Sequence, residues 1–276
     1  MLSVILDACV LFPMYLRDTL LTTAEFGLYM PYWSQKILNE AMDKLVLKEM
    51  VSAELAKKLQ ETIKTAFPEA MVEQVPWEIE AAMTNHPKDR HVLAAAIIAR
   101  ADIIVTNNLK DFSASALAPL NIKAHSPDNF LSDLFDKYPE EMVQVVQRQS
   151  SKYKRKPQTV DELLELLSKQ IPGFTAKILL HEYGESIFNT TNKALNIVGR
   201  PSPESGKYLE GERYRVWRNK EILTITAKDS RGKILQVKNC KIEGKLSSPD
   251  VKAFQIFEQS LEQELEQAKI QKSQTS

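Results

Sequence analysis

The sequence has little cysteine, no long apolar run and no net charge, and each absence excludes a class of protein. Its 276 residues include two cysteines, Cys9 and Cys240, which are too few and too far apart for a disulfide framework or a zinc knuckle. We expect both to be small buried hydrophobes. No apolar run approaches the roughly 18 residues of a membrane span, and the N-terminus meets Asp7 too early for a signal peptide. We therefore expect a cytoplasmic protein without membrane association.

The zero net charge hides an asymmetry along the chain. Residues 1–150 contain 14 Lys and Arg against 20 Asp and Glu, whereas residues 151–250 contain 19 against 12. A basic part beside an acidic part suits a metal-binding catalytic module joined to a segment that faces a polyanion. Attraction between the two parts of the chain explains the pattern equally well, so charge alone leaves both interpretations open.

Periodicity predicts an α/β domain over residues 1–135. A short apolar strand at 3–6 runs into Asp7, and helical patterns follow it. Pro87 opens another helical pattern, and the next strand, DIIVT at 102–106, is apolar almost throughout. A strand that is apolar on both faces is typical of a parallel sheet covered by helices. We therefore predict a three-layer α/β fold with a central parallel sheet.

The remainder of the chain has three further parts. Residues 136–198 contain helical patterns and a basic linker, SSKYKRKP, and are predicted to be a helical extension. Residues 199–270 contain short alternating strands separated by turn residues and then an amphipathic helical pattern, which predicts a small antiparallel β-meander with a terminal helix. We expect residues 271–276 to be a disordered tail.

Acidic residues gather where the predicted strands of the first domain end. The acids that can reach this edge are Asp7, Glu40, Asp89 and Asp111. Binding sites in open α/β sheets lie at the carboxyl ends of the strands. Four carboxylates meeting there would repel one another unless a divalent cation neutralised them. Oxygen ligands without a His or Cys pattern suit Mg²⁺ or Mn²⁺ rather than zinc.

Other α/β carboxylate sites fit the sequence less well. A haloacid-dehalogenase-type phosphatase needs a second Asp two residues after the first, where this chain has Cys9. A receiver domain needs an acidic pair before its first loop, and no such pair is present. No glycine-rich loop follows the first strand, which argues against a Rossmann or P-loop nucleotide site. Each acid taken singly also suits a turn or a helix terminus, so only their combination supports a site.

Five segments together resemble the motifs of PIN-domain nucleases, particularly the longer VapC-like ribonuclease toxins of toxin–antitoxin systems. They are LDACVLFP (6–13), LRD (16–18), WSQKILNE (33–40), DRHVLAAAI (89–97) and VTNNLKDF (105–112). The helix TVDELLELL and the IPGF turn extend the similarity to about residue 183. The part from residue 199 onward has no place in the family.

The resemblance implies a metal held by Asp7 and Asp89, with Glu40 nearby as a ligand or a water-orienting group. Thr106 would steady Asp7 or the loop through its hydroxyl. The implied activity is Mg²⁺-dependent hydrolysis of RNA phosphodiesters by the toxin of a type II toxin–antitoxin system. The implied partners are the RNA substrate, a cognate antitoxin and a second copy in a homodimer.

The sequence departs from the family pattern just after Thr106. The family often has its fourth acid directly after this Thr or two positions beyond it, where this chain has Asn107 and Asn108. Asp111 is then the carboxylate that the loop offers. Whether Asp111 or Asn108 completes the metal site stays open, as does the choice between one metal and two. Glu40 or Asp89 would orient or deprotonate the attacking water.

RNA contacts are harder to assign from the sequence. Candidates in the first domain are Arg17, Arg90 and His91, each of which could equally pair with a carboxylate. In the basic part, aromatic residues and cations interleave at Tyr208, Arg213, Tyr214, Arg215, Trp217 and Arg218. This pattern suits a nucleic-acid surface and makes Arg213 and Arg215 further candidates. Simple strand alternation, with Tyr214 and Val216 facing a core, accounts for it as well.

A binding protein is therefore the competing interpretation of the whole chain. In that case the basic C-terminal domain would bind nucleic acid or another protein, and the PIN-like domain would serve as a scaffold.

Overall fold

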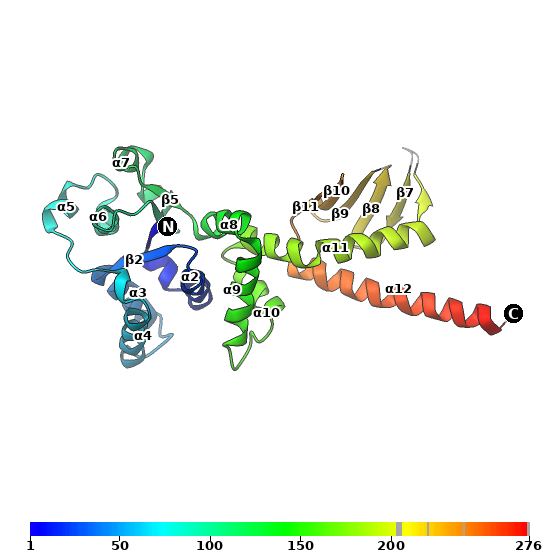
Figure 1. Cartoon of the computed structure of the whole chain (residues 1–276), viewed down its shortest axis with the longest axis horizontal. Helices are drawn as coiled ribbons and strands as arrows, with labels where there is room; N and C mark the ends of the chain where they lie inside the picture. The colour runs from blue at the N-terminus through cyan, green and yellow to red at the C-terminus, as the bar shows by residue number, and fades with distance from the viewer. Residues whose placement is uncertain (203–205, 220, 240, 275–276) are drawn as a thin grey trace. The chain divides into compact units, whose positions relative to one another are not determined.

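The computed structural model describes residues 1–202, 206–219, 221–239 and 241–274, with side chains described as far as residue 261. The chain divides into two compact units, Met1–Ile171 (unit 1) and Pro172–Ser276 (unit 2) (Figure 1). The division falls inside the segment 136–198. Cys240, expected to be buried, lies outside the described residues.

Unit 1 is built on a five-stranded parallel sheet with the strand order β3-β2-β1-β4-β5. Its strands are β1 (Ser3–Leu6), β2 (Met30–Ser34), β3 (Met71–Val72), β4 (Ile103–Val105) and β5 (Lys123–His125). Val4, Ile5 and Leu6 are all fully buried. Because successive residues of a strand face opposite sides of the sheet, both faces of β1 are covered. The predicted α/β fold with a central parallel sheet is confirmed.

The helices of unit 1 are α1 (Ala8–Leu11), α2 (Met14–Glu25), α3 (Gln35–Leu47), α4 (Ala53–Ala66), α5 (Trp77–Ala82), α6 (Arg90–Ile98), α7 (Ala114–Leu117), α8 (Pro127–Lys137), α9 (Pro139–Ser151) and α10 (Val160–Leu167). Short 3₁₀ turns, among them η2 (Pro87–Asp89) and η3 (Leu109–Asp111), lie between them. Capping residues begin several helices: the Ser34 hydroxyl accepts a hydrogen bond from the Ile37 amide at α3. Pro87 was expected to open an α-helix, but it opens η2, and α6 begins at Arg90.

The strand order creates a topological switch point at β1. This strand pairs with β2 on one side and with β4 on the other. In open α/β sheets, ligands bind outside the carboxyl ends of the strands at such a switch point. Asp7 follows β1 directly, and Thr106 follows β4 directly.

Unit 2 consists of two long helices and a six-stranded antiparallel sheet with the strand order β11-β10-β9-β8-β7-β6. Its elements are α11 (Pro172–Val198), β6 (Arg200–Pro201), β7 (Lys207–Glu210), β8 (Tyr214–Asn219), β9 (Ile222–Ala227), β10 (Lys233–Lys238), β11 (Lys241–Gly244) and α12 (Ser248–Gln274). Both helices lie on the same face of this sheet (Figure 1). The predicted β-meander and terminal helix are confirmed, and β6 and β7 extend the meander.

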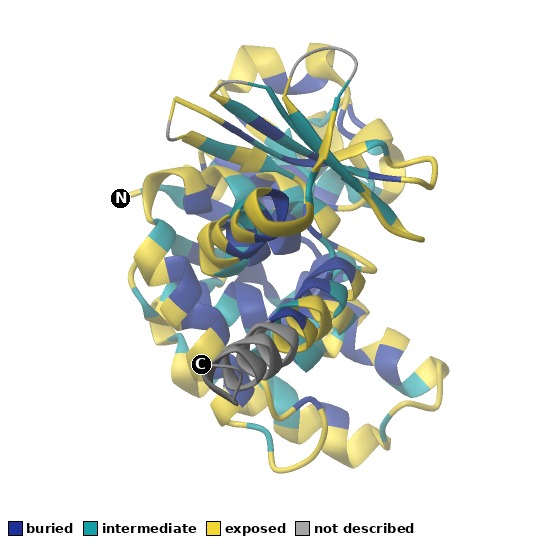
Figure 2. Cartoon of the chain, turned by 90° about the vertical axis from the view of Figure 1, so that its right-hand side faces the viewer, coloured by how far each residue is buried: buried dark blue, intermediate teal, exposed yellow. Residues whose placement is uncertain are grey.

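Burial alternates along β9, and Figure 2 shows buried and more exposed stretches within the sheet of unit 2. On α12, Val251, Phe254 and Leu261 are buried, whereas Phe257 is 37% exposed. The helix continues to Gln274, so residues 271–274 of the expected disordered tail are helical. Residues 275 and 276 of that tail lie outside the described residues. Throughout the described chain, no helix is long and apolar enough to cross a membrane.

Candidate active site

Asp7 is the most deeply placed acid at the switch point of unit 1. Its side chain is only 3% exposed, and Thr106 is fully buried beside it. The Thr106 hydroxyl donates to Asp7 Oδ2 at 2.6 Å, and the same hydroxyl accepts the Asn108 amide at 2.9 Å. Asp7 Oδ1 accepts no hydrogen bond within the described chain. One carboxylate oxygen is therefore fixed by the fold, while the other is left for a ligand.

Cys9 contributes to the same network, which the sequence analysis missed. It is half-buried rather than fully buried, and its thiol donates to Asp7 Oδ2 at 3.1 Å. The sulfur also accepts the Asn107 amide at 3.2 Å. Burial, followed by the charge of Asp7, raises the pKa of Cys9 to about 12. Cys9 therefore stays a neutral thiol that holds the first carboxylate and the loop after β4 together.

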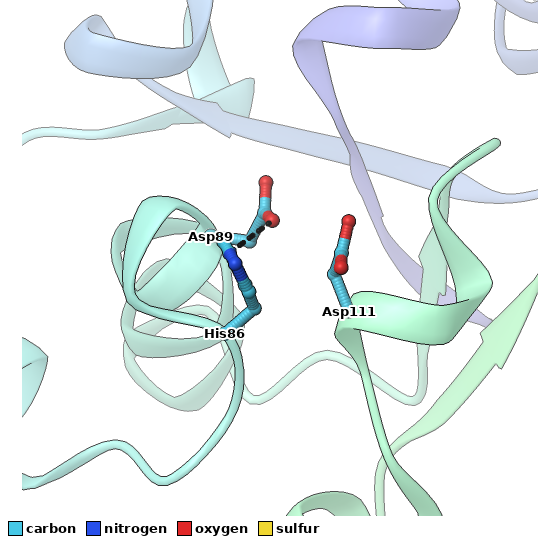
Figure 3. A group of neighbouring side chains, drawn as sticks. All are labelled: His86, Asp89 and Asp111. Atoms are coloured by element: carbon cyan, nitrogen blue, oxygen red, sulfur yellow. Dashed lines mark ion pairs between the residues drawn. The ribbon is translucent and has the colours of Figure 1, made fainter.

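A second group of side chains brings together Asp89, Asp111 and a histidine that the sequence analysis did not include (Figure 3). Each of His86, Asp89 and Asp111 offers one ligand atom, and these atoms lie within 4.8 Å of one another. His86 Nδ1 lies 3.7 Å from Asp89 Oδ2, and the His86 amide donates to the Asp111 carbonyl at 3.1 Å. His86 stands three residues before Asp89, so one 3₁₀ turn carries both side chains to the site.

The carboxylates act on one another electrostatically. The pKa of Asp89 is raised, first by burial and then by the negative charges of Asp7 and Asp111. The two nearby histidines, His91 and His86, oppose this shift but do not cancel it. Asp7 thus lies close enough to the second group for its charge to disfavour ionisation of Asp89. Three acids from separate parts of the chain therefore share one electrostatic site.

Glu40 lies beside a histidine at the edge of this region. Its Oε2, on α3, is 3.2 Å from Nε2 of His91 on α6. The Glu40 side chain is 44% exposed and the His91 side chain 2%. Glu40 is not a member of the group of ligand atoms formed by His86, Asp89 and Asp111. Its position suits a water-orienting group better than a direct ligand.

Burial decides against two of the candidate RNA contacts in unit 1. Arg17 is 5% exposed, and its Nη1 donates to the Leu11 carbonyl at 3.0 Å, which ties α2 to the end of α1. Burial also lowers the pKa of its guanidinium. His91, 2% exposed, faces Glu40. A contact with RNA does not fit the burial of either side chain, whereas Arg90 is only half-buried.

The donor set suits a hard divalent cation. It is dominated by carboxylate oxygens, the ligands that Mg²⁺ and Mn²⁺ prefer, and it contains no thiolate because Cys9 stays protonated. Burial and then the negative charges of Asp7 and Asp111 raise the pKa of Asp89, and a bound cation would relieve this excess of negative charge. The residues present therefore fit a metal ion of this class.

Comparison with protein families gives two matches within the chain. Residues 3–110 match the PIN domain family, and this stretch contains Asp7, Glu40 and Asp89. Residues 3–110 are a PIN domain. Residues 127–179 match the family described as VapC50 C-terminal domain. The resemblance inferred from the five sequence motifs is thereby confirmed.

One curated relative supports the same assignment. The protein named "Putative ribonuclease VapC50" from Mycobacterium tuberculosis strain H37Rv is 49% identical over 100 residues. The match covers 36% of this chain and 59% of the relative. The chain thus matches less than two thirds of that protein's length. No solved structure matches the chain, and both family matches end before residue 180.

Proposed function

We propose that this PIN-domain protein is a metal-dependent endoribonuclease that hydrolyses RNA phosphodiesters. The observation that carries the proposal is the convergence of Asp7, Asp89 and Asp111 at the switch point of the PIN sheet, where burial and then the charges of Asp7 and Asp111 raise the pKa of Asp89. The name of the M. tuberculosis relative, which describes a ribonuclease, supports RNA as the substrate.

Each side chain has a definable task in this proposal. Asp7, Asp89 and Asp111 would hold Mg²⁺ or Mn²⁺, with His86 beside them. A bound cation of this kind lowers the pKa of a coordinated water and stabilises charge on the phosphate. Thr106 fixes the orientation of Asp7 by hydrogen bonding to Oδ2. Glu40, which lies beside His91, would orient or deprotonate the attacking water, and Asp89 is the alternative base.

We propose further that the enzyme is the toxin of a type II toxin–antitoxin system. The motif resemblance to VapC-like toxins and the match of residues 127–179 to the VapC50 C-terminal domain family support this role. Its partners would be a cognate antitoxin and, in a homodimer, a second copy. Growth arrest on expression, relieved by Asp7→Asn, is the expected result. Normal growth with the soluble wild-type protein present would argue for a nuclease outside such a system.

The nuclease proposal is tested by cleavage of labelled RNA with Mg²⁺ or with EDTA. Asp7→Asn and Asp89→Asn should each abolish Mg²⁺-dependent cleavage, because the electrostatic contribution of the metal site dominates this chemistry. Asp43→Asn is the matched control, since Asp43 is an exposed acid on α3 and its change should leave the rate unaltered. Undiminished cleavage by purified Asp7→Asn or Asp89→Asn protein would refute the assignment.

The competing function, a binding protein with an inactive PIN scaffold, predicts a different outcome in the same assay. The wild-type protein would then bind RNA or a protein partner but would not cleave RNA under any metal condition.

A further inference from the structure

The sheet of unit 2 has one face covered by helices, and the contacts of β8 identify which side chains point to it. The Tyr214 hydroxyl donates to Asp250 Oδ1 on α12 at 2.8 Å. Arg218 Nη2 donates to Asn196 Oδ1 on α11 at 2.9 Å. These residues are four apart in one strand and therefore face the same side. Arg215 and Trp217, which alternate with them, project from the opposite face.

Strand register carries this opposite face across the whole sheet. Trp217 is paired with Tyr208 on β7 and with Thr224 on β9. Thr224 is paired in turn with Gln236 on β10. The Gln236 side-chain amide donates to the Thr224 hydroxyl at 3.2 Å, which shows that these two share a face. We call the surface formed by the strand side chains that point away from α11 and α12 the open face. Tyr208 and Trp217 are adjacent on this face, and both are partly exposed.

Cations lie on the open face in β8 itself and in strands on both sides of the two aromatic residues. By register and side-chain contacts they are Arg200, Arg215, Lys233, Lys238 and Lys241, against the acids Glu210 and Glu243. Lys238 and Lys241 are directly paired across β10 and β11. Like charges in such a pair destabilise a sheet unless a negative charge compensates them.

The nearby cations lower the pKa of both acids on the open face. The pKa of Glu210 is lowered to about 2 by hydrogen bonds and charge from Lys228 and Arg215. The pKa of Glu243 is lowered chiefly by Lys241, with further contributions from Lys233 and Lys238. Cations thus outnumber acids on this face, and several of them act on the same carboxylate.

This combination matches the chemistry of an unpaired nucleic-acid strand. Every base has a flat face that can stack on an aromatic side chain. The phosphates that link the bases are attracted to nearby cations. A duplex keeps its bases stacked inside and would leave Tyr208 and Trp217 without a partner. Neither ring is needed to cover the sheet, since α11 and α12 lie on the other face (Figure 1).

We propose that the open face of unit 2 binds single-stranded RNA by stacking bases on Tyr208 and Trp217. The choice of RNA over DNA rests on the proposed nuclease function, and the inference adds the class of substrate, an unpaired strand. Unit 2 would then hold the strand that unit 1 cleaves.

The test measures binding separately from cleavage. Full-length protein in EDTA and low salt is titrated against a short fluorescein-labelled oligouridine, and affinity is read from anisotropy. Trp217→Ala and Tyr208→Ala should each weaken binding about tenfold or more, and Trp217→Phe should restore most of it. Trp77→Ala is the matched control, because Trp77 is a 74% exposed tryptophan on α5 of unit 1. Its affinity should equal that of the wild type.

The salt dependence of binding and the comparison of single-stranded with duplex RNA provide two further tests. Affinity should fall with salt at a slope of about −0.7 per phosphate contact on a single strand, and Lys238→Gln should reduce that slope whereas the exposed unit 1 variant Lys57→Gln should not. Duplex RNA should bind more weakly than oligouridine and should be insensitive to Trp217→Ala.

Three results would overturn the proposal: wild-type affinity in both Trp217→Ala and Tyr208→Ala, an equal loss in Trp77→Ala, or no binding of oligouridine at low salt, as expected if the face docks a protein instead. The two proposals fail separately. A protein that binds oligouridine through Trp217 but never cleaves RNA with Mg²⁺ refutes the nuclease function alone. If the wild-type protein cleaves RNA and the Trp217→Ala variant binds oligouridine with wild-type affinity, only the proposed role of the open face is refuted.

Discussion

Replacement of Thr106 by Val should show how strongly the fold holds the first carboxylate. The two side chains have nearly the same shape, but Val lacks the hydroxyl that donates to Asp7 Oδ2 at 2.6 Å and accepts the Asn108 amide at 2.9 Å. Thr106 is 0% exposed and Asp7 is 3% exposed. Water therefore cannot easily replace the lost partner, and the variant leaves a buried carboxylate short of one strong hydrogen bond.

The expected loss of stability follows from these two bonds. A hydrogen bond to a charged group contributes about 1.5–3 kcal/mol, and one between neutral groups about 0.5–1.5 kcal/mol. The Cys9 thiol still donates to Oδ2, so the loss should fall in the lower part of the combined range, at about 2–3 kcal/mol. For a unit of this size each kcal/mol lowers Tm by about 2–4 °C. The transition of unit 1 should therefore fall by roughly 4–12 °C.

Scanning calorimetry in EDTA measures this loss, with Thr106→Ser as the control. Ser keeps the hydroxyl and removes one methyl group, which should cost only about 0.5–1.5 kcal/mol. In an Asp7→Asn background the effect of Thr106→Val should shrink, because the charged acceptor is gone. Equal losses for the Val and Ser variants, or an undiminished Val effect in the Asp7→Asn background, would show that the hydrogen bond to Asp7 is not what stabilises this corner.

Two further predictions concern charge in the two units. Asp89→Asn should raise the Tm of the metal-free protein at neutral pH. Burial and then the charges of Asp7 and Asp111 raise the pKa of Asp89 on folding, and such a carboxyl lowers stability once the pH exceeds its unfolded value; an unchanged or lower Tm would contradict this combined effect of burial and charge. In unit 2, burial opposes ionisation of Asp250, but hydrogen bonds from Arg231, Ser247 and Tyr214 outweigh it and lower its pKa. Its stabilisation of roughly 2 kcal/mol should be present above pH 4 and fade as the pH falls further. Asp250→Asn should remove that part of the acid sensitivity in a circular-dichroism melt, and parallel stability curves would refute the assignment.

The parts of the fold that could be predicted from the sequence are those where local pattern and tertiary position agree. The runs before Asp7 and Thr106 are apolar on both faces, and a strand buried on both sides of a parallel sheet requires that composition. In unit 2, buried and partly exposed residues alternate from Ile222 to Ala227 because one face of the sheet is covered.

The strand β2 shows why other parts could not be predicted. Its sequence MPYWS contains Pro31, which sequence rules assign to edge strands or turns, yet the strand lies between β1 and β3. Pairing with both neighbours and burial of Trp33 outweigh the lost amide donor. His86 was missed for a related reason. Its proximity to Asp111 depends on a backbone hydrogen bond between segments that are distant in the sequence. No local sequence pattern predicts such a hydrogen bond.

The loop VTNNLKDF shows how the chain reaches a similar charge arrangement despite its departure from the family pattern. The positions that often hold the fourth acid carry Asn107 and Asn108, and their amides are used to anchor the loop to Cys9 and Thr106. The turn η3 follows, with the Asp111 amide donating to the Asn108 carbonyl at 2.9 Å, and the Asp111 carbonyl accepts the His86 amide at 3.1 Å.

The Asp111 backbone is thus fixed from both sides, and its carboxylate lies in the group with Asp89 and His86. This geometry supports Asp111 over Asn108 as the residue that completes the proposed site. The local geometry gives the physical reason: a 3₁₀ turn advances the chain by about 2 Å per residue, so an acid three residues beyond Asn108 can still face the carboxylate of Asp89. The amides secure the loop, and the acid beyond them supplies the charge.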